Sequence, residues 1–306
     1  MINSTFCTII TKSHLAFSQA LHFSLSGEKK INFHVLITDT EDKIALPGIT
    51  THTLKKVISD SETGQKISAK YNNTPDELRW SLKPIFINYL FDNGYDKVIF
   101  TDPDTFYFSD FSFLFNELDE HNILLTPHWR GLDLTVDQSN FDLQFVGGLF
   151  NAGFIGVNQK AVKVMDWWAK CCLHKCVKDF SIGQFVDQTY LNLIPIYFDK
   201  VKILKHQGCN VANWNQVVCK RELKNGKVLI NDSWEIVFIH FTKSTIKGIV
   251  QGKDTLLADH LAKYIDTLAK NGKELIINDY FPKRVSKNNN LKKLTHWLKK
   301  RSTGNS

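Results

Sequence analysis

The chain lacks the features that mark secreted and membrane-spanning proteins. It has no run of the roughly 18 apolar residues that a spanning helix needs, and its first residues show no basic segment followed by an apolar one. Its six cysteines fall at spacings that match no disulfide scaffold. We therefore expect no transmembrane segment and a location in the reducing cytosol.

One group of cysteines suggests zinc by residue type alone. Cys171, Cys172, His174 and Cys176 lie close together in a segment with helical spacing. On a single helix these side chains point in different directions, so they cannot close a tetrahedron around one ion. We expect them, and the neighbouring pair Trp167–Trp168, to pack in the core.

Excess positive charge is absent outside one segment. The net charge is +7, but eight of the 38 Lys and Arg lie between Lys283 and Arg301, where no acidic residue occurs. The rest of the chain therefore carries 30 basic against 31 acidic residues. Because nucleic-acid enzymes spread positive charge over a folded face, we expect no nucleic-acid partner.

The basic segment is also amphipathic. Leu291, Leu294, Trp297 and Leu298 repeat at helical spacing among its lysines. Such a helix can lie on an anionic membrane with its apolar stripe down and its cations over the headgroups. The hypothesis is a protein held peripherally on the inner face of the membrane, and the alternative is a solvated terminus.

Apolar runs and helical patterns alternate along the rest of the chain, which is typical of an α/β protein. A β-rich run at Phe6–Thr11 predicts a strand, and Ser13 is suited to cap the helix that follows. Gly27 ends this helix, and Phe33–Thr38 predicts a second strand. A strand-helix-strand unit of this length predicts parallel pairing.

Later segments continue the alternation. Helical spacing covers Pro75–Tyr89, and Pro84 is expected to kink this helix or to begin a second one. Lys97–Phe100 predicts a short buried strand. We also expect a strand at 154–157, a helix at 160–176, a short helix after Asp187 that Pro195 ends, strands at 202–204 and 236–240, and a helix from residue 255.

Two carboxylates stand where the strand Lys97–Phe100 ends, in the run Thr101-Asp102-Pro103-Asp104. Pro103 fixes its own φ and favours extended backbone at Asp102, so Asp102 and Asp104 are presented on one side. Ligands of open α/β sheets collect beyond the carboxyl ends of strands. Such a pair suits a divalent cation that bridges a diphosphate, and the alternative is a solvated turn.

Five stretches between residues 5 and 245 occur in a recognisable order. They are Val98-Ile-Phe-Thr-Asp-Pro-Asp104, Phe150-Asn-Ala-Gly-Phe-Ile-Gly-Val157, Asp187-Gln-Thr-Tyr-Leu-Asn192, Gly208-Cys-Asn-Val-Ala-Asn-Trp-Asn215 and Ile239-His-Phe241. In this order they resemble motifs of the GT-A glycosyltransferases, especially the retaining families that include glycogenin-like and bacterial lipopolysaccharide galactosyltransferases.

The resemblance implies one α/β fold of the GT-A, Rossmann-like type, with a mostly parallel sheet flanked by helices. Residues 1–250 would form the glycosyltransferase domain, and residues 251–306 a C-terminal helical extension with the basic amphipathic tail. The implied reaction is metal-dependent, retaining transfer of a hexose from a nucleoside diphosphate sugar, with UDP favoured, to a glycan or lipid-linked acceptor. Front-face attack and double displacement both stay open.

The resemblance also implies a metal site. Asp102 and Asp104 match the family's DxD ligands, and His240 matches its third protein ligand. Two carboxylates, one imidazole and diphosphate oxygens suit Mn²⁺ or Mg²⁺ better than zinc. The alternative for His240 is a histidine satisfied at a strand end.

Asp187 and Gln188 match the pair that lies beside the sugar ring in retaining relatives, and we predict them as the catalytic residues. Asp187 would hold sugar hydroxyls, and Gln188 would face the developing oxocarbenium ion. Asn151, Ala152 and Gly153 would bring an amide and an open backbone to the donor sugar. The alternatives are a helix N-terminus with an acidic first turn and a simple turn into a buried strand.

The donor's diphosphate needs a cation, because the leaving group carries the developing negative charge. The family has a lysine shortly after the histidine, but this chain has Ile246 at that position. The nearby Lys243 or Lys247 would supply the cation instead. Lys83 is a further candidate, although an exposed helix lysine is the favoured interpretation. The nucleoside would contact Thr11, Lys12 and Asp39 beyond the first two strands, with His14 near the base.

Asn210, Asn213 and Trp214 combine amides with an aromatic face, which suits the hydroxyls and the apolar face of an acceptor sugar. Two other functions remain as alternatives. A non-catalytic carbohydrate-binding protein would use these groups without a metal. A sugar-nucleotide pyrophosphorylase would need a Gly-rich phosphate loop near the first strand, which Thr11–His14 does not provide.

Overall fold

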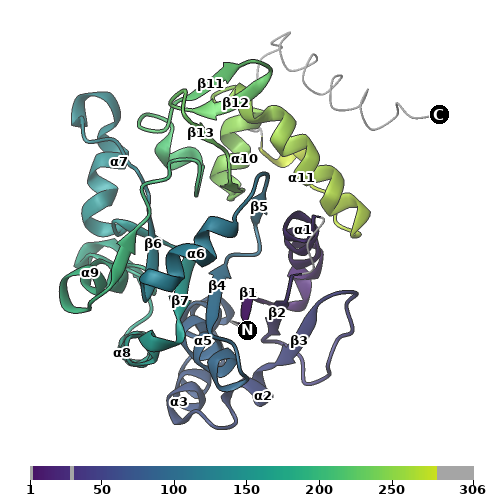
Figure 1. Ribbon diagram of the computed structural model, residues 1–306, viewed down its shortest axis with the longest axis vertical. Coiled ribbons are helices and arrows are strands. Elements are labelled where there is room, and N and C mark those ends of the chain that lie inside the picture. The colour runs from purple at the N-terminus through teal and green to yellow at the C-terminus, as the bar shows by residue number, and fades with distance from the viewer. Residues whose placement is uncertain (1–2, 28–30, 281–306) are drawn as a thin grey trace.

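The computed structural model describes residues 3–27 and 31–280 (Figure 1). A central seven-stranded sheet has the order β10-β6-β7-β4-β1-β2-β3. Its strands are β1 (Ser4–Ile10), β2 (Phe33–Ile37), β3 (Thr50–Thr53), β4 (Lys97–Thr101), β6 (Ile123–Pro127), β7 (Phe150–Asn158) and β10 (Val201–Ile203).

The sheet is mostly parallel, as the sequence predicts. β1 pairs in parallel with both β2 and β4, and further parallel pairs join β2 to β3 and β6 to β10. β7 runs antiparallel between β4 and β6. The carboxyl end of β4 therefore meets the amino end of β7, which brings Asp102 beside Gly153 through a 2.8 Å hydrogen bond from the Asp102 N–H to the Gly153 carbonyl.

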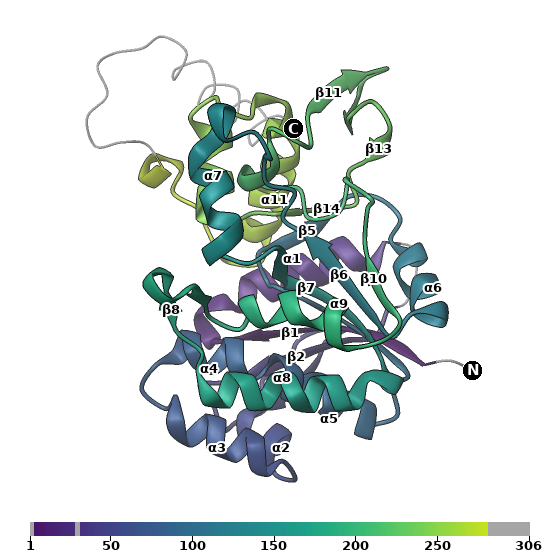
Figure 2. The ribbon, with the colours of Figure 1, turned by 90° about the vertical axis from the view of Figure 1, so that its left-hand side faces the viewer.

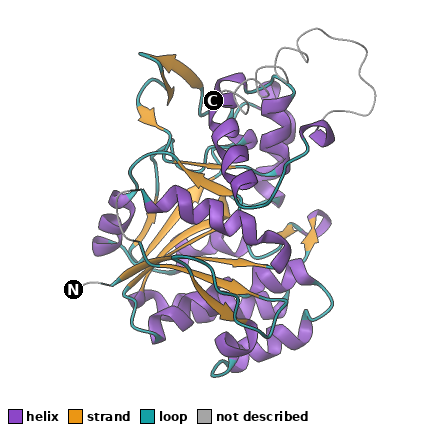
Figure 3. Ribbon diagram, turned by 90° about the vertical axis from the view of Figure 1, so that its right-hand side faces the viewer, coloured by secondary structure: helices purple, strands orange, loops and turns teal. Residues whose placement is uncertain are grey.

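Helices cover both faces of this sheet, as Figure 3 shows. The described helices are α1 (Leu15–Ser26), α2 (Leu54–Ile58), α3 (Glu62–Lys70), α4 (Pro75–Ser81), α5 (Lys83–Asp92), α6 (Ser112–Glu120), α7 (Leu134–Val146), α8 (Val162–His174), α9 (Ile194–Tyr197), α10 (Lys243–Val250) and α11 (Ala258–Lys270).

The two faces take alternate residues of each strand. Val98 and Phe100 of β4 pack in one core with α5 and α8, whereas Ile99 packs in the other with α1 and α6. This alternation follows from the pleat of a strand. Because both faces are covered, β1, β2 and β7 are buried almost throughout.

A smaller layer lies beyond the carboxyl edge of the sheet (Figure 2). There β5 (Thr105–Tyr107) pairs antiparallel with β14 (Phe238–His240), which sets His240 opposite Thr105. A three-stranded sheet adds β11 (Arg221–Lys224), β12 (Lys227–Ile230) and β13 (Trp234–Glu235) to this layer, whereas the short pair β8 (Lys178–Asp179) and β9 (Gln184–Phe185) follows α8. A third core joins this layer to α10 and α11.

Several predicted elements are confirmed, and two local predictions are wrong. Ser13 does not cap α1, because it lies inside a 3-10 turn, Lys12–His14, and α1 begins after His14. The unit β1-α1-β2 is present with parallel pairing, and Pro84 lies in the first turn of a second helix, α5. Pro195 does not end a helix, because it lies in the first turn of α9. Proline is tolerated there since its missing N–H has no helical partner.

The cysteine-rich segment packs only partly in the core, because His174 is exposed and Cys171 and Trp167 are partly buried. Cys172, Cys176 and Trp168 are fully buried, and none of the six cysteines in the described residues forms a disulfide. Within residues 3–27 and 31–280, no helix combines the length and the apolar character that crossing a bilayer requires. The predicted amphipathic segment Lys283–Arg301 lies outside the described residues.

Candidate active site

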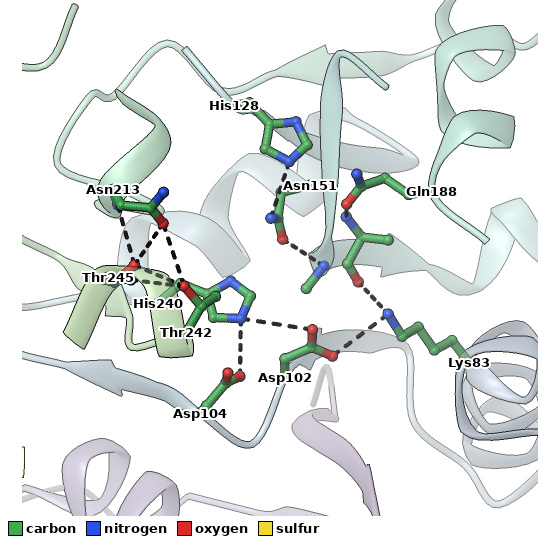
Figure 4. Close-up of polar contacts among 12 residues, drawn as sticks. Lys83, Asp102, Asp104, His128, Asn151, Gln188, Asn213, His240, Thr242 and Thr245 are labelled. Atoms are coloured by element: carbon green, nitrogen blue, oxygen red, sulfur yellow. Dashed lines mark hydrogen bonds and ion pairs between the residues drawn. The ribbon is translucent and has the colours of Figure 1, made fainter. Parts of the chain in front are cut away.

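Asp102, Asp104 and His240 converge where β4, β5 and β14 meet (Figure 4). His240 Nε2 lies 2.9 Å from Asp104 Oδ1 and 3.9 Å from Asp102 Oδ2. One ligand atom from each residue lies within 4.8 Å of the other two. The donor set of two carboxylates and one imidazole fits Mn²⁺ or Mg²⁺ with phosphate oxygens as further ligands.

The charges of this cluster support one another. Burial lowers the pKa of His240, but Asp104 and Asp102 outweigh this effect, so the pKa lies above its ordinary value. Burial likewise raises the pKa of Asp104, yet contact with His240 brings it below the ordinary value. Without a metal, His240 and Asp104 therefore form an ion pair, and a cation that binds here displaces a proton.

Gly153 permits this convergence. A Cβ at Gly153 would lie 2.6 Å from His240 Cε1 and 2.8 Å from Asp102 Oδ2, so any other residue would push the two ligands aside. The sequence predicts an open backbone here for the donor sugar. Asn151–Gly153 lies inside β7 and not in a turn before it, and side chains of His240, Asp102 and Asn151 surround the space beside Gly153. The contact of these residues with a donor sugar stays a prediction.

Lys83 is buried in the site, so its interpretation as an exposed helix lysine is wrong. Only 3% of the residue is exposed. Its Nζ donates a 2.9 Å hydrogen bond to the Ala152 carbonyl and forms ion pairs of 3.1 Å with Asp187 and 3.6 Å with Asp102. The chain breaks into two helices at Leu82, so the spacing of one continuous helix does not give the direction of Lys83.

The predicted pair Asp187 and Gln188 lies beside Lys83 and β7. Asp187 is 1% exposed, and burial raises the pKa of its carboxyl to about 6, although Lys83 opposes this shift. Gln188 Oε1 accepts a 3.0 Å hydrogen bond from the Ala152 N–H, and its Nε2 donates to the Gly147 carbonyl at 2.5 Å. Gln188 thus ties the start of β7 to the preceding loop.

A cavity of about 480 Å³ opens beside Asp102 and Asp104. Of the residues predicted to bind the nucleotide, His14, Lys83 and Lys243 also line it. Lys247 is exposed and is not among the described residues that line this cavity.

Thr11, Lys12 and Asp39 lie together beyond the ends of β1 and β2. Thr11 Oγ1 is 3.0 Å from His14 Nδ1, and the Lys12 N–H donates a 2.8 Å hydrogen bond to Asp39 Oδ1. Lys12 and Asp39 line a second hollow, which extends towards Thr38 and Lys55.

The predicted acceptor residues lie on the other side of His240. The Trp214 ring meets the His240 and His128 rings edge-on, at centroid distances of 5.5 and 5.3 Å. Both amide atoms of Asn210 and Nε1 of Trp214 are buried without a hydrogen-bond partner in the described part of the chain. Asn213 Oδ1 accepts from the hydroxyls of Thr242 and Thr245 and so holds the start of α10.

Sequence reasoning missed His128. Its Nε2 lies 3.3 Å from Asn151 Nδ2, and Asn151 Oδ1 accepts a 2.6 Å hydrogen bond from the Gly153 N–H. Burial holds the pKa of His128 well below its ordinary value, with the positive charge of Arg130 adding to the shift, so the ring is neutral. Its place directly after the apolar run Ile123–Pro127, a strand end, is the signal that would have indicated it.

Solved structures share this architecture, and the fold is that of the GT-A glycosyltransferases. The galactosyltransferase LgtC in complex with donor and acceptor sugar analogs aligns with a TM-score of 0.56 over 90% of this chain and 100% of its own, at 12% identity. Mouse xyloside xylosyltransferase 1 in its apo form aligns with a TM-score of 0.51 over 80% of this chain and 99% of its own, at 13% identity.

Two proteins of Bacillus subtilis (strain 168), both uncharacterized, are similar in sequence. YfnF is 26% identical over 258 residues, which cover 81% of this chain and 84% of YfnF. YfnD is 29% identical over 250 residues, which cover 79% of this chain and 78% of YfnD. No family model matches the chain.

Proposed function

We propose that this protein is a metal-dependent glycosyltransferase that moves a hexose from a nucleoside diphosphate sugar, with UDP favoured, to a glycan or lipid-linked acceptor. The convergence of Asp102, Asp104 and His240 at the cavity carries this proposal. Two carboxylates and one imidazole within this distance are the ligand types that Mn²⁺ or Mg²⁺ takes beside a diphosphate. The fold shared with a galactosyltransferase and a xylosyltransferase supports the same reaction class.

The bound metal, Mn²⁺ or Mg²⁺, would neutralise the diphosphate as it leaves. Asp102, Asp104 and His240 would hold it. Lys83 keeps Asp187 and Asp102 in place through its two ion pairs, and so fixes the carboxylate of Asp187 beside β7.

The sugar would lie against Asp187 and Gln188, where Asp187 accepts from its hydroxyls and Gln188 faces the anomeric carbon. We propose retention of the anomeric configuration, either by front-face attack of the acceptor hydroxyl or by double displacement. Asn210 and Trp214 would bind the acceptor, since their buried polar atoms offer two donors and one acceptor that have no described partner.

A titration calorimetry experiment tests the function. UDP should bind to the metal-free protein weakly and to the Mn²⁺-loaded protein tightly, and a screen of nucleotide sugars should then give metal-dependent transfer or hydrolysis. A carbohydrate-binding protein would show no metal-dependent nucleotide binding. A pyrophosphorylase would instead form a nucleotide sugar from a sugar phosphate and a nucleoside triphosphate.

The membrane partner is a separate proposal, and it rests on the sequence from Lys283 to Arg301. We propose that this segment holds the enzyme on the inner face of the membrane, beside a lipid-linked acceptor. A truncation ending at Val285 should keep activity on a soluble acceptor and lose sedimentation with anionic vesicles. Full-length protein that fails to sediment at low salt would refute the membrane role.

A further inference from the structure

The C-terminal segment forms part of the wall of the cavity beside Asp102 and Asp104. Lys273, Leu275 and Tyr280 line it together with residues from the sheet edge. Ile246 also lines it, at the position where the glycosyltransferases that this chain resembles have a lysine for the diphosphate. The cavity therefore has no cation at position 246, but Lys273, from a later segment of the chain, lines it.

Hydrogen bonds join the segment that carries Lys273 to α11 and α10. The Lys273 N–H donates a 3.0 Å hydrogen bond to the Leu268 carbonyl at the end of α11. Gln251 Nε2 donates to the Tyr280 carbonyl at 2.8 Å, which ties the far end of the segment to α10. In α11, the Tyr264 ring stacks on Phe241, the residue after the metal ligand His240, at a centroid distance of 4.4 Å.

The other cations of the cavity wall are already paired. Lys83 forms ion pairs with Asp102 and Asp187, and Arg79 pairs with Asp76. In contrast, no carboxylate in the described residues lies within ion-pair distance, 4.0 Å, of the exposed side chains of Lys243 and Lys273. Their charges are therefore free to act on a ligand.

The pKa of His14 is influenced by the charge of Lys273. Burial lowers the pKa of His14 first, the charges of Arg79 and Lys273 lower it further, and Asp104 opposes them. His14 itself lines the cavity. The positive charge of Lys273 is thus felt within the space beside the metal ligands.

We propose that Lys273, from the C-terminal segment, binds the diphosphate of the donor and takes over the role that a lysine at position 246 has in the glycosyltransferases this chain resembles. This inference rests on the proposed function. A diphosphate keeps negative charge that one divalent cation does not neutralise, and an ammonium group with an unpaired charge and a flexible stem can follow that charge as the leaving group departs.

The test is calorimetric titration of the full-length, Mn²⁺-loaded protein with UDP and with uridine. Lys273→Ala should weaken UDP binding about tenfold, the loss expected when one charge-assisted contact to phosphate is removed. Lys273→Arg should restore most of the affinity. Uridine binding should be the same in all variants, because uridine carries no phosphate.

Lys270→Ala is the matched control, since Lys270 lies three residues earlier at the end of α11 and pairs only with the exposed Asp266 in the described chain. It should bind UDP as the unmodified protein does. Equal UDP affinity of Lys273→Ala and the unmodified protein would overturn the inference alone, as would a loss confined to Lys243→Ala. Failure of the unmodified protein to bind UDP with Mn²⁺ would overturn the proposed function as well.

Discussion

The two sides of the candidate site differ in whether their buried polar groups have partners. On the donor side, Lys83, Asp102 and Asp187 form a chain of ion pairs, and Asp104 pairs with His240. On the acceptor side, Asn210 and the Trp214 indole are buried with polar atoms that have no described partner. If the predicted donor and acceptor roles are correct, the donor side is organised before any ligand arrives, and the acceptor side has polar atoms that a ligand could pair.

This contrast has an energetic basis. A buried polar group without a partner costs about 1–3 kcal/mol, and a neutral sugar hydroxyl can recover that cost. Charged groups left unpaired in the same position would cost far more, so they are paired internally or by a metal. Variants on the two sides should therefore fail in different ways.

The largest effect is expected for Asp104→Ala on the donor side. It should reduce transfer about 1,000-fold or more, because a metal ligand is lost. The melting temperature of the metal-free protein should change little, since His240 can lose its proton once the carboxylate is gone. Activity assays and thermal unfolding with and without Mn²⁺ measure both effects.

The exposed carboxylate Asp60 gives the control. Asp60→Ala should keep full activity, and Mn²⁺ should raise its melting temperature as it does for the unmodified protein. In Asp104→Ala the metal should give no such increase. Normal turnover of Asp104→Ala would remove the metal assignment and with it the difference between the two sides.

A smaller loss, about 100-fold in kcat, is expected for Gln188→Ala, because an interaction made mainly in the transition state is removed. The affinity for UDP should stay within about twofold, since Gln188 is predicted to contact the sugar and not the nucleotide. The oxygen of its side-chain amide accepts from the backbone and the nitrogen donates to it, so about 1–2 kcal/mol of stability should also be lost. An equal loss of UDP affinity would contradict the predicted role.

Local patterns of the sequence were sufficient for β1, α1, β2 and the carboxylates Asp102 and Asp104, because spacing and strand ends are properties of neighbouring residues. The antiparallel direction of β7 was not predictable, since periodicity does not record strand direction. β6 was missed because its apolar run, Ile123–Leu125, is only three residues long and is too short to show a period. Lys83 reaches the site because the helix breaks at Leu82, and Lys273 reaches it from a segment far along the chain. Neither feature has a sequence motif.

On the acceptor side, Trp214→Phe should raise the KM for the acceptor about tenfold, the equivalent of about 1.4 kcal/mol. The phenyl ring keeps most of the packing against His240, but the indole N–H is lost. UDP affinity should not change. Steady-state kinetics with the acceptor varied, together with UDP titration, measure the two quantities. A change in UDP affinity without a change in acceptor KM would place Trp214 on the donor side.

The pH dependence of stability isolates the buried carboxyl of Asp187. Its pKa in the folded protein, about 6, is higher than the ordinary value of 3.8. Between these values the folded state holds a proton that the unfolded state has released, so the free energy of unfolding should fall as pH rises, by at most about 1.4 kcal/mol per pH unit. Asp187→Asn cannot titrate and should lack this slope, while the exposed Asp92→Asn should keep it.

Urea unfolding of the metal-free proteins between pH 4 and 7 gives the difference directly, because all other groups titrate alike in the three proteins. Parallel curves for Asp187→Asn and the unmodified protein would mean that Lys83 holds Asp187 ionised throughout, and that the donor side is charged in full before the metal binds.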